Sequence, residues 1–320
     1  ADWASLCTGI TDIPVYDTLP PNQIAYILND AEVRLIFVSS SAQLAKVQEI
    51  WDQVPSLERA VLFDGESGDE RVLTLAALEA RGAAEEAAGK GGDFRERALR
   101  CSPEDIATML YTSGTTGNPK GVLLSHNNIR SNVEACGRLF EASPEDRAVS
   151  FLPLSHILER MVDYWLYSKG VTIAYVHDIA LVADSLREVK PTIAASTPRL
   201  YEKVYDAVLS QPGIKGKLVH WAARVGRRWT EAKLAGRNPG GLTSLQHGIA
   251  DRLVFAKLRG RLGGSLRFFI SGGAPLADHV AKFFYGAGVL LLEGYGLTET
   301  SPVTNVNTPD DWKKLVGKDL

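Results

Sequence analysis

Residues 112–121 form a dense run of small hydroxyl and glycine residues that could hold an anionic ligand. Its candidate ligand-binding members are Thr112, Ser113, Gly114, Thr115, Thr116, Gly117 and Lys120. Glycines allow backbone N–H groups to turn toward a ligand, and the hydroxyl groups add further hydrogen-bond donors. Lys120 adds a positive charge. Together these groups supply what is needed to hold a polyphosphate.

Two common phosphate-binding patterns do not fit this run. A Walker A loop would need glycine at Pro119 and serine or threonine at Gly121. The dinucleotide pattern G-x-G-x-x-G would need glycine at Thr116. The run therefore predicts a phosphate loop of another kind, and the apolar residues 106–110 before it predict a strand that leads into the loop.

A second motif, residues 293–300, follows an apolar run over 289–292 and reads Glu-Gly-Tyr-Gly-Leu-Thr-Glu-Thr. Two glycines flank Tyr295, so its ring could lie against a flat base. Thr298 offers a hydroxyl group to a phosphate, and Glu299 offers a carboxylate of the kind that Mg²⁺ accepts alongside phosphate oxygens. A tight turn around a buried tyrosine is the alternative explanation of this motif. The candidate nucleotide-site residues here are Glu293, Gly294, Tyr295, Gly296, Thr298 and Glu299.

Two further stretches could contribute to a site. Small residues follow the apolar run 266–270, and they would let the backbone approach a ligand closely. They are Gly272, Gly273, Ala274 and Pro275. A helix entry with Pro275 near its first turn is the alternative. The other stretch is 151–160, which places His156 at a predicted helix start, where a histidine is commonly a structural group.

These motifs together resemble those of the adenylate-forming superfamily, which includes acyl-CoA synthetases, peptide-synthetase adenylation domains and luciferases. Residues 111–121 resemble the phosphate loop of that superfamily almost letter for letter. Residues 13–19, 154–161 and 197–203 resemble the long-chain fatty acyl-CoA synthetase branch. The resemblance covers essentially the whole chain.

The resemblance implies a role for each motif. Tyr295 would stack on adenine, Thr298 would contact the α-phosphate, and Glu299 with Thr115 would hold Mg²⁺. Residues 272–275 would lie between adenine and the acyl group. His156 would orient the acyl carboxylate and, with a pKa near neutrality, could also sense charge there. The residues expected to act most directly in the reaction are Lys120, Thr298 and His156.

The implied reaction has two steps: a fatty acid attacks the α-phosphate of ATP to give acyl-AMP, and the thiol of coenzyme A then displaces AMP. An enzyme that loads a carrier protein, or a non-catalytic acyl-nucleotide-binding protein, are the alternatives. The superfamily's ribose-binding Thr-Gly-Asp segment and its C-terminal lid with a catalytic lysine are not found. We therefore expect a chain truncated at both ends that alone binds nucleotide weakly and turns over poorly.

Strand-like apolar runs alternate with helical patterns along the chain, which predicts an α/β fold with parallel-rich sheets flanked by helices. The predicted strands are 33–38, 59–63, 106–110, 171–175, 192–195, 266–270 and 289–292. We expect residues 1–105 to form part of a first α/β subdomain with a peripheral excursion at 64–100. Residues 106–320 would form the nucleotide- and acyl-binding subdomain.

Bulk properties narrow the choice of partners. The 320-residue chain has a net charge of −3, which gives no reason to expect nucleic acid as a partner. Three cysteines, no signal-peptide pattern and no apolar run of about 18 residues predict a cytoplasmic protein. Oligomerisation stays open.

Residues 215–261 are locally basic, with eleven Lys or Arg against two acidic residues. This segment is either a core-facing helix with a solvated basic face or a surface for anionic lipid headgroups or an anionic cofactor tail. The second interpretation predicts peripheral contact with the inner face of a membrane.

Overall fold

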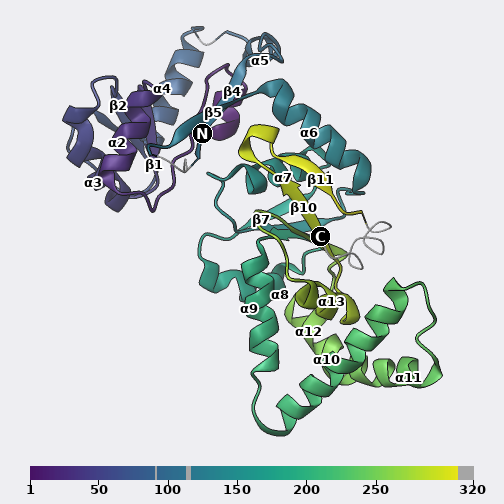
Figure 1. The fold of residues 1–320 in the computed structure, drawn as a ribbon. Coiled ribbons are helices and arrows are strands. Elements are labelled where there is room, and N and C mark those ends of the chain that lie inside the picture. The colour runs from purple at the N-terminus through teal and green to yellow at the C-terminus, as the bar shows by residue number, and fades with distance from the viewer. Residues whose placement is uncertain (91, 113–116, 309–320) are drawn as a thin grey trace. The chain divides into compact units, whose positions relative to one another are not determined.

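The computed structural model describes residues 1–90, 92–112 and 117–308 (Figure 1). The chain divides into two compact units, Ala1–Ile129 and Arg130–Leu320, and each is described by itself. The predicted division between residues 105 and 106 was based on where the motifs lie, whereas these units are defined by compactness. The predicted division therefore stays a prediction.

The first unit contains a small parallel sheet of order β1-β2-β3 with helices against it. Buried aliphatic residues of α2 and α3 pack with β1 and β2 into its core. The predicted strands at 33–38 and 59–63 are confirmed. The excursion at 64–100 contributes β3 and the helix α4, which has no buried residue. The elements are α1 (Asp2–Leu6), α2 (Pro21–Asp30), β1 (Leu35–Val38), α3 (Ser41–Ile50), η1 (Trp51–Gln53), β2 (Arg59–Leu62), β3 (Val72–Thr74), α4 (Leu75–Ala87) and α5 (Phe94–Leu99).

An antiparallel hairpin completes this unit. Its strands are β4 (Ile106–Thr112) and β5 (Lys120–Ser125), and Thr112 pairs with Lys120 at its closed end. The helix α6 (His126–Leu139) follows. The strand predicted at 106–110 is thus confirmed, and its partner strand begins at the lysine of the predicted phosphate loop.

The second unit is built on a six-stranded sheet of order β11-β10-β9-β8-β6-β7. All neighbouring pairs are parallel except β10 and β11. Its strands are β6 (Arg147–Ser150), β7 (Thr172–Tyr175), β8 (Ile193–Ser196), β9 (Phe268–Ser271), β10 (Leu291–Gly296) and β11 (Val303–Val306). Its helices are α7 (Ile157–Ser168), η2 (Ile179–Leu181), α8 (Val182–Val189), α9 (Pro198–Leu209), α10 (Gly213–Leu234), α11 (Gly241–Ala250), η3 (Asp251–Phe255), α12 (Ala256–Arg261), α13 (Asp278–Gly286) and η4 (Thr298–Thr300).

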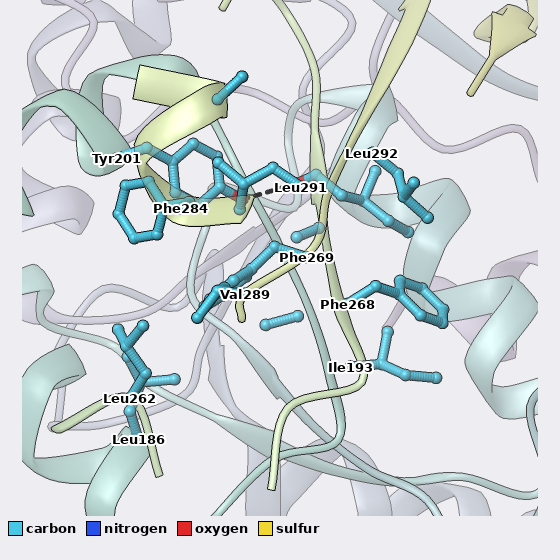
Figure 2. Close-up of a cluster of buried hydrophobic side chains, with 14 of the residues drawn as sticks. Leu186, Ile193, Tyr201, Leu262, Phe268, Phe269, Phe284, Val289, Leu291 and Leu292 are labelled. Carbon is cyan, nitrogen blue, oxygen red and sulfur yellow. Dashed lines mark hydrogen bonds between the residues drawn. The ribbon is translucent and has the colours of Figure 1, made fainter. Parts of the chain in front are cut away.

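Helices cover both faces of this sheet, as predicted for a parallel-rich α/β fold. On one face, Phe268 stacks on Phe140, which in turn contacts Trp165 of α7. On the other face, Phe269 meets the ring edge of Tyr201 from α9 (Figure 2). The Tyr201 hydroxyl group donates a 2.9 Å hydrogen bond to the backbone oxygen of Ile270. The central strands are therefore fixed from both sides, which holds their ends in place.

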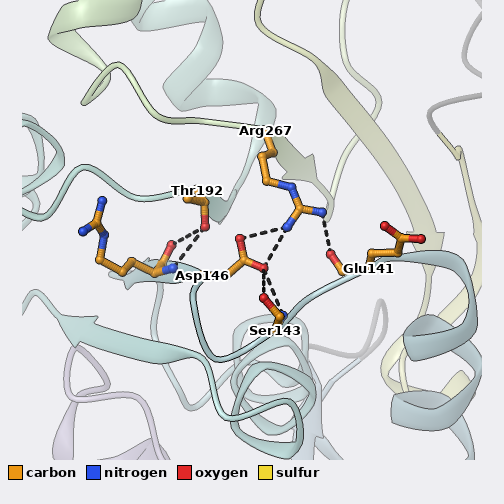
Figure 3. Close-up of polar contacts among 6 residues, drawn as sticks. Glu141, Ser143, Asp146, Thr192 and Arg267 are labelled. Carbon is orange, nitrogen blue, oxygen red and sulfur yellow. Dashed lines mark hydrogen bonds and ion pairs between the residues drawn. The ribbon is translucent and has the colours of Figure 1, made fainter.

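An ion pair fixes the amino-terminal edge of the sheet. Asp146, just before β6, accepts two hydrogen bonds of 2.8 and 2.7 Å from Arg267, just before β9 (Figure 3). Burial alone would raise the pKa of Asp146, but hydrogen bonds from Thr192 and Arg267 and from the Ser143 backbone lower it further than burial raises it. The ionised pair thus joins β6 and β9 at the edge opposite their carboxyl ends.

Among the described helices, none combines the length and the apolar character that crossing a bilayer would require.

Candidate functional site

The first-unit part of the predicted site lies at the closed end of the β4–β5 hairpin. Thr112 ends β4, Lys120 begins β5, and Gly117 lies in the connection between them, with Lys120 and Gly117 exposed. The predicted residues Ser113, Gly114, Thr115 and Thr116 lie outside the described residues. The pairing of Thr112 with Lys120 fixes the two described ends of this connection.

Tyr111 lies at the base of this connection, and the sequence alone gave no indication of its role. Its hydroxyl group donates a 2.6 Å hydrogen bond to Asp30 at the end of α2. Burial and then this hydrogen bond raise the pKa of Tyr111 well above its usual value. The tyrosine therefore stays a neutral donor, and its hydrogen bond ties the end of β4 to the end of α2.

In the second unit, two predicted motifs meet at the carboxyl ends of β9 and β10. Ser271 ends β9 and is the register partner of Glu293 in β10. The Glu293 carboxylate accepts a 3.0 Å hydrogen bond from the Leu276 backbone N–H, just after the turn 272–275. Glu293 thus holds this turn against β10, so its visible contact is a positioning one. Ligands of parallel α/β sheets bind at this edge of the sheet.

The turn itself approaches the start of α7. A Cβ atom at Gly272 would lie 2.9 Å from Leu158 Cδ2, closer than real side chains come. Gly273 has a φ of +82°, which favours glycine. The Gly272 backbone N–H donates a 3.1 Å hydrogen bond to the Ser196 oxygen at the end of β8. Ala274 and Pro275 complete the turn. Pro275 lies three residues before α13, which begins at Asp278, so the turn also leads into that helix.

His156 caps the amino end of α7. Its Nδ1 accepts a 3.1 Å hydrogen bond from the Leu158 backbone N–H, and burial lowers the pKa of its ring. A neutral ring that accepts at Nδ1 carries its proton at Nε2. This geometry suits a hydrogen-bond donor better than a sensor of charge.

The motif at 294–300 comprises the last three residues of β10, which pair with β11, and the start of the turn between the two strands. Tyr295 is 65 % exposed, so the alternative of a buried tyrosine is wrong. A Cβ atom at Gly296 would lie 1.8 Å from the Pro302 backbone oxygen, which only glycine permits. Thr298 and Glu299 lie in the short helix η4, with the Glu299 side chain exposed. The ring, the hydroxyl group and the carboxylate therefore lie on one short segment held by β10.

Two buried carboxyl groups lie in α7, the helix that His156 caps, and they were not predicted from the sequence. Glu159 Oε1 accepts a 3.2 Å hydrogen bond from the Phe151 backbone N–H, and Asp163 Oδ2 accepts a 3.1 Å hydrogen bond from the Ser150 hydroxyl group. Burial, and then the charge of Asp163, raises the pKa of Glu159 to about 8; burial raises that of Asp163 to about 6. Glu159 thus holds the segment that leads to His156. The signal was two acids four residues apart inside an apolar helix.

The structure thus gathers the predicted residues of each unit separately. Thr112, Gly117 and Lys120 share the end of one hairpin, and His156 with the segments 272–275 and 293–300 belongs to the carboxyl edge of the second-unit sheet. Within the described ranges, no group of three or more His, Cys, Asp and Glu side chains could hold a metal ion. Of the two predicted metal ligands, Glu299 is an exposed carboxylate and Thr115 lies outside the described residues.

With this geometry established, the chain can be compared with known proteins. The family model described as AMP-binding enzyme matches residues 1–319, and the chain belongs to this family. It is 35 % identical over 323 aligned residues to the long-chain-fatty-acid--CoA ligase FadD15 of Mycobacterium bovis, which covers 99 % of this chain and 52 % of that protein. It is 31 % identical to long-chain-fatty-acid--CoA ligase 5 of Rattus norvegicus, with 94 % and 44 % covered.

Solved structures support the fold. A long-chain-fatty-acid-CoA ligase (FadD1) from Archaeoglobus fulgidus matches with a TM-score of 0.66 at 20 % identity, covering 96 % of this chain and 51 % of that one. The N-terminal domain of FACL13 from Mycobacterium tuberculosis matches with a TM-score of 0.64 at 18 % identity, covering 97 % and 62 %. The chain spans about half the length of the curated relatives it matches.

Proposed function

We propose that the protein containing this chain activates a fatty acid in two steps, first to acyl-AMP with release of pyrophosphate and then to acyl-CoA. Support comes from the family and from relatives that are long-chain-fatty-acid--CoA ligases. The observation that carries the proposal is the exposed Tyr295 at the carboxyl edge of a parallel sheet, with the turn 272–275 fixed beside its strand by Glu293.

ATP is proposed as a substrate of this site. The Tyr295 ring would stack on adenine, and Gly294 would let the backbone of β10 approach the base. The missing side chain at Gly272 makes room for Leu158 and holds the turn 272–275 close to α7. Thr298 would donate to the α-phosphate. The phosphate loop would hold the outer phosphates through backbone N–H groups and the Lys120 ammonium group, which stabilises charge as the α-phosphate is attacked.

Mg²⁺ fits the oxygen donors proposed here. Glu299 is an exposed carboxylate, and the other expected ligand, Thr115, lies outside the described residues. One or two protein oxygens together with phosphate oxygens are the usual set for this ion. When bound, Mg²⁺ would neutralise charge on the phosphates.

The acyl carboxylate is proposed to lie near His156. Its Nε2–H would donate to a carboxylate oxygen and orient the nucleophile, with the ring held by the Leu158 N–H. Relatives favour a long acyl chain and coenzyme A as the acceptor. Transfer to a carrier protein, and a non-catalytic role in acyl-nucleotide binding, remain the alternatives. The ordered contacts of Glu293 and His156 favour a working site over the non-catalytic role.

Partners other than substrates are proposals drawn from charge. Peripheral contact of residues 215–261 with an anionic membrane face is proposed, together with a cytoplasmic location. Nucleic acid is not proposed as a partner. Oligomerisation is left to measurement.

The proposed reaction predicts fatty-acid-dependent exchange of pyrophosphate into ATP by the whole protein. Exchange with dodecanoate but not acetate, lost in Lys120→Ala, is the expected result. Exchange without any later thioester in the presence of coenzyme A, but with acyl transfer to a carrier protein, would favour the alternative acceptor. Lack of exchange with every acid would contradict the proposal.

A further inference from the structure

The outer face of the helical segment from α11 to α12 is apolar. Residues 241–261 run through α11, the π-helical turn η3 and α12 without interruption. Four large apolar side chains recur on this segment at intervals of three, four and four residues, which places them on one side. They are Leu242, Leu245, Ile249 and Leu253, which are 70 %, 64 %, 46 % and 41 % exposed. We call them the outer stripe.

The inner face of the same segment already supplies its packing. Ala250, Phe255 and Leu258 are buried in the core of the second unit. His247 stacks on Trp229 of α10 with ring centroids 4.4 Å apart, and its Nε2 lies 2.7 Å from the Gly286 oxygen. The outer stripe is therefore not needed to attach the helix. A helix that is apolar on both sides is expected to be covered on both sides.

The surroundings of the outer stripe are strongly basic. Residues 215–261 carry eleven Lys or Arg and two acidic residues, in a chain whose net charge is −3. Both acids already have basic partners within the segment, because Glu231 lies 3.8 Å from Arg227 and Asp251 lies 2.5 Å from Arg259. Arg252 and Lys257 are exposed on the same outer side as the stripe. Figure 1 shows α10 and α11 projecting from the sheet of the second unit.

We propose that the outer stripe inserts into the surface of an anionic lipid bilayer. The four side chains would enter the boundary between headgroups and acyl chains, and Arg252 and Lys257 would lie at the level of the lipid phosphates. An apolar stripe flanked by basic residues is typical of helices that bind at a membrane surface. A second copy of the chain is a poorer match, because the two basic surfaces would repel each other. This proposal rests on the membrane contact proposed above for residues 215–261 and names the side chains that would make it; it does not depend on the proposed reaction.

Vesicle co-sedimentation tests the proposal. The chain should bind phosphatidylcholine vesicles that contain phosphatidylserine, bind weakly to phosphatidylcholine alone, and lose affinity as salt rises. Replacing two stripe residues in Leu245→Ser/Ile249→Ser should lower the affinity at least about tenfold, because two large apolar side chains no longer enter the bilayer. Replacing the flanking charges in Arg252→Glu/Lys257→Glu should lower it by a similar factor.

A matched control is available in the first unit. Phe94 and Leu99 are 59 % and 73 % exposed on α5, so Phe94→Ser/Leu99→Ser removes comparable exposed apolar surface elsewhere. This control should bind vesicles as the wild type does. Circular dichroism and thermal unfolding should show that all variants are folded. Unchanged binding by the stripe variant, or an equal loss in the control, would overturn the proposal.

Insertion itself has a separate readout. The chain has six native tryptophans, so the readout is the difference between the emission of Leu245→Trp and that of the wild type. This difference spectrum should shift to the blue on addition of phosphatidylserine vesicles. An unshifted spectrum would overturn insertion. Absence of binding to any vesicle, with a change from dimer to monomer in the stripe variant by ultracentrifugation, would show that protein covers the stripe and would also overturn the proposal. Binding of an acyl-adenylate mimic should be the same in the stripe variant and the wild type.

Discussion

Replacing Gly296 with alanine should open the β10–β11 hairpin, whose strand β10 carries Tyr295 and whose turn carries Thr298 and Glu299. The new Cβ atom would lie 1.8 Å from the Pro302 oxygen and 2.7 Å from its carbonyl carbon. Both are backbone atoms, so no side chain can rotate out of the way. Reaching even a 3.0 Å contact requires the two strands to separate by about 1.2 Å.

The cost can be worked from the bonds that such a movement breaks. The Pro302 oxygen accepts hydrogen bonds from the Leu297 N–H at 3.1 Å and from the Thr300 hydroxyl group at 2.5 Å. Losing two such bonds costs about 1–3 kcal/mol, and residual strain adds to it. We expect a local cost of about 2–4 kcal/mol, and at least a tenfold loss of affinity for an acyl-adenylate, because the closed turn must be restored before binding.

Calorimetric titration with a non-hydrolysable dodecanoyl-adenylate mimic measures this effect. Gly82→Ala in α4 is the matched control, because its Cβ atom would have no neighbour within 4 Å and the residue lies outside the proposed site. The control should bind nearly as the wild type does, while Gly296→Ala binds poorly, melts several degrees lower and is still folded at the temperature of the titration. Wild-type affinity in Gly296→Ala would refute the reasoning, and so would an equal loss in Gly82→Ala.

Three further predictions concern positioning groups. The folded-state pKa of Glu159, about 8, lies above its ordinary value of 4.5, so wild-type stability should fall as pH rises through this range. Glu159→Gln should therefore be the more stable protein at pH 9 by about 1–3 kcal/mol, and parallel melting curves from pH 5 to pH 9 would contradict this. The pKa of Asp146 is lowered in the folded protein. Its ion pair with Arg267 therefore stabilises the fold at pH values above the pKa of an unfolded aspartate, and this stabilisation is lost as pH falls through the folded-state pKa. Asp146→Asn should lose about 1–3 kcal/mol in urea unfolding at pH 7 and less at acid pH; an equal loss at both would count against the ion pair. Tyr111→Phe removes the bond to Asp30 and should weaken binding of the adenylate mimic several-fold, or about 1 kcal/mol, by calorimetry; unchanged affinity would remove Tyr111 from the account.

The sequence predicted the elements whose apolar runs are continuous. The strands expected at 171–175, 192–195, 266–270 and 289–292 are β7, β8, β9 and β10, because buried parallel strands consist almost entirely of aliphatic and aromatic residues. The strands β3, β5, β6 and β11 were missed. Each is short or contains polar residues, so a continuous apolar run does not mark it.

The residues of the candidate site were identified from the sequence, but the contacts that position them were not. Glu293 was proposed to bind nucleotide, and its visible hydrogen bond is to the Leu276 backbone. Glu159 and Asp163 resemble a charged helix face in sequence, and only the packing of α7 against the sheet shows them buried. Periodicity also cannot tell an inner apolar stripe from an outer one, so the exposure of Leu242 and Leu245 needed the structure.

The central claim is that Tyr295 and Lys120 belong to an adenylate site with room for a long acyl chain. Calorimetric titration of the chain with dodecanoyl- and acetyl-adenylate mimics tests it most directly. We predict tighter binding of the dodecanoyl mimic, lost in Tyr295→Ala and in Lys120→Ala. Equal binding of both mimics would contradict the long-chain part of the account. Wild-type affinity in both variants, or binding of neither mimic, would contradict the site itself.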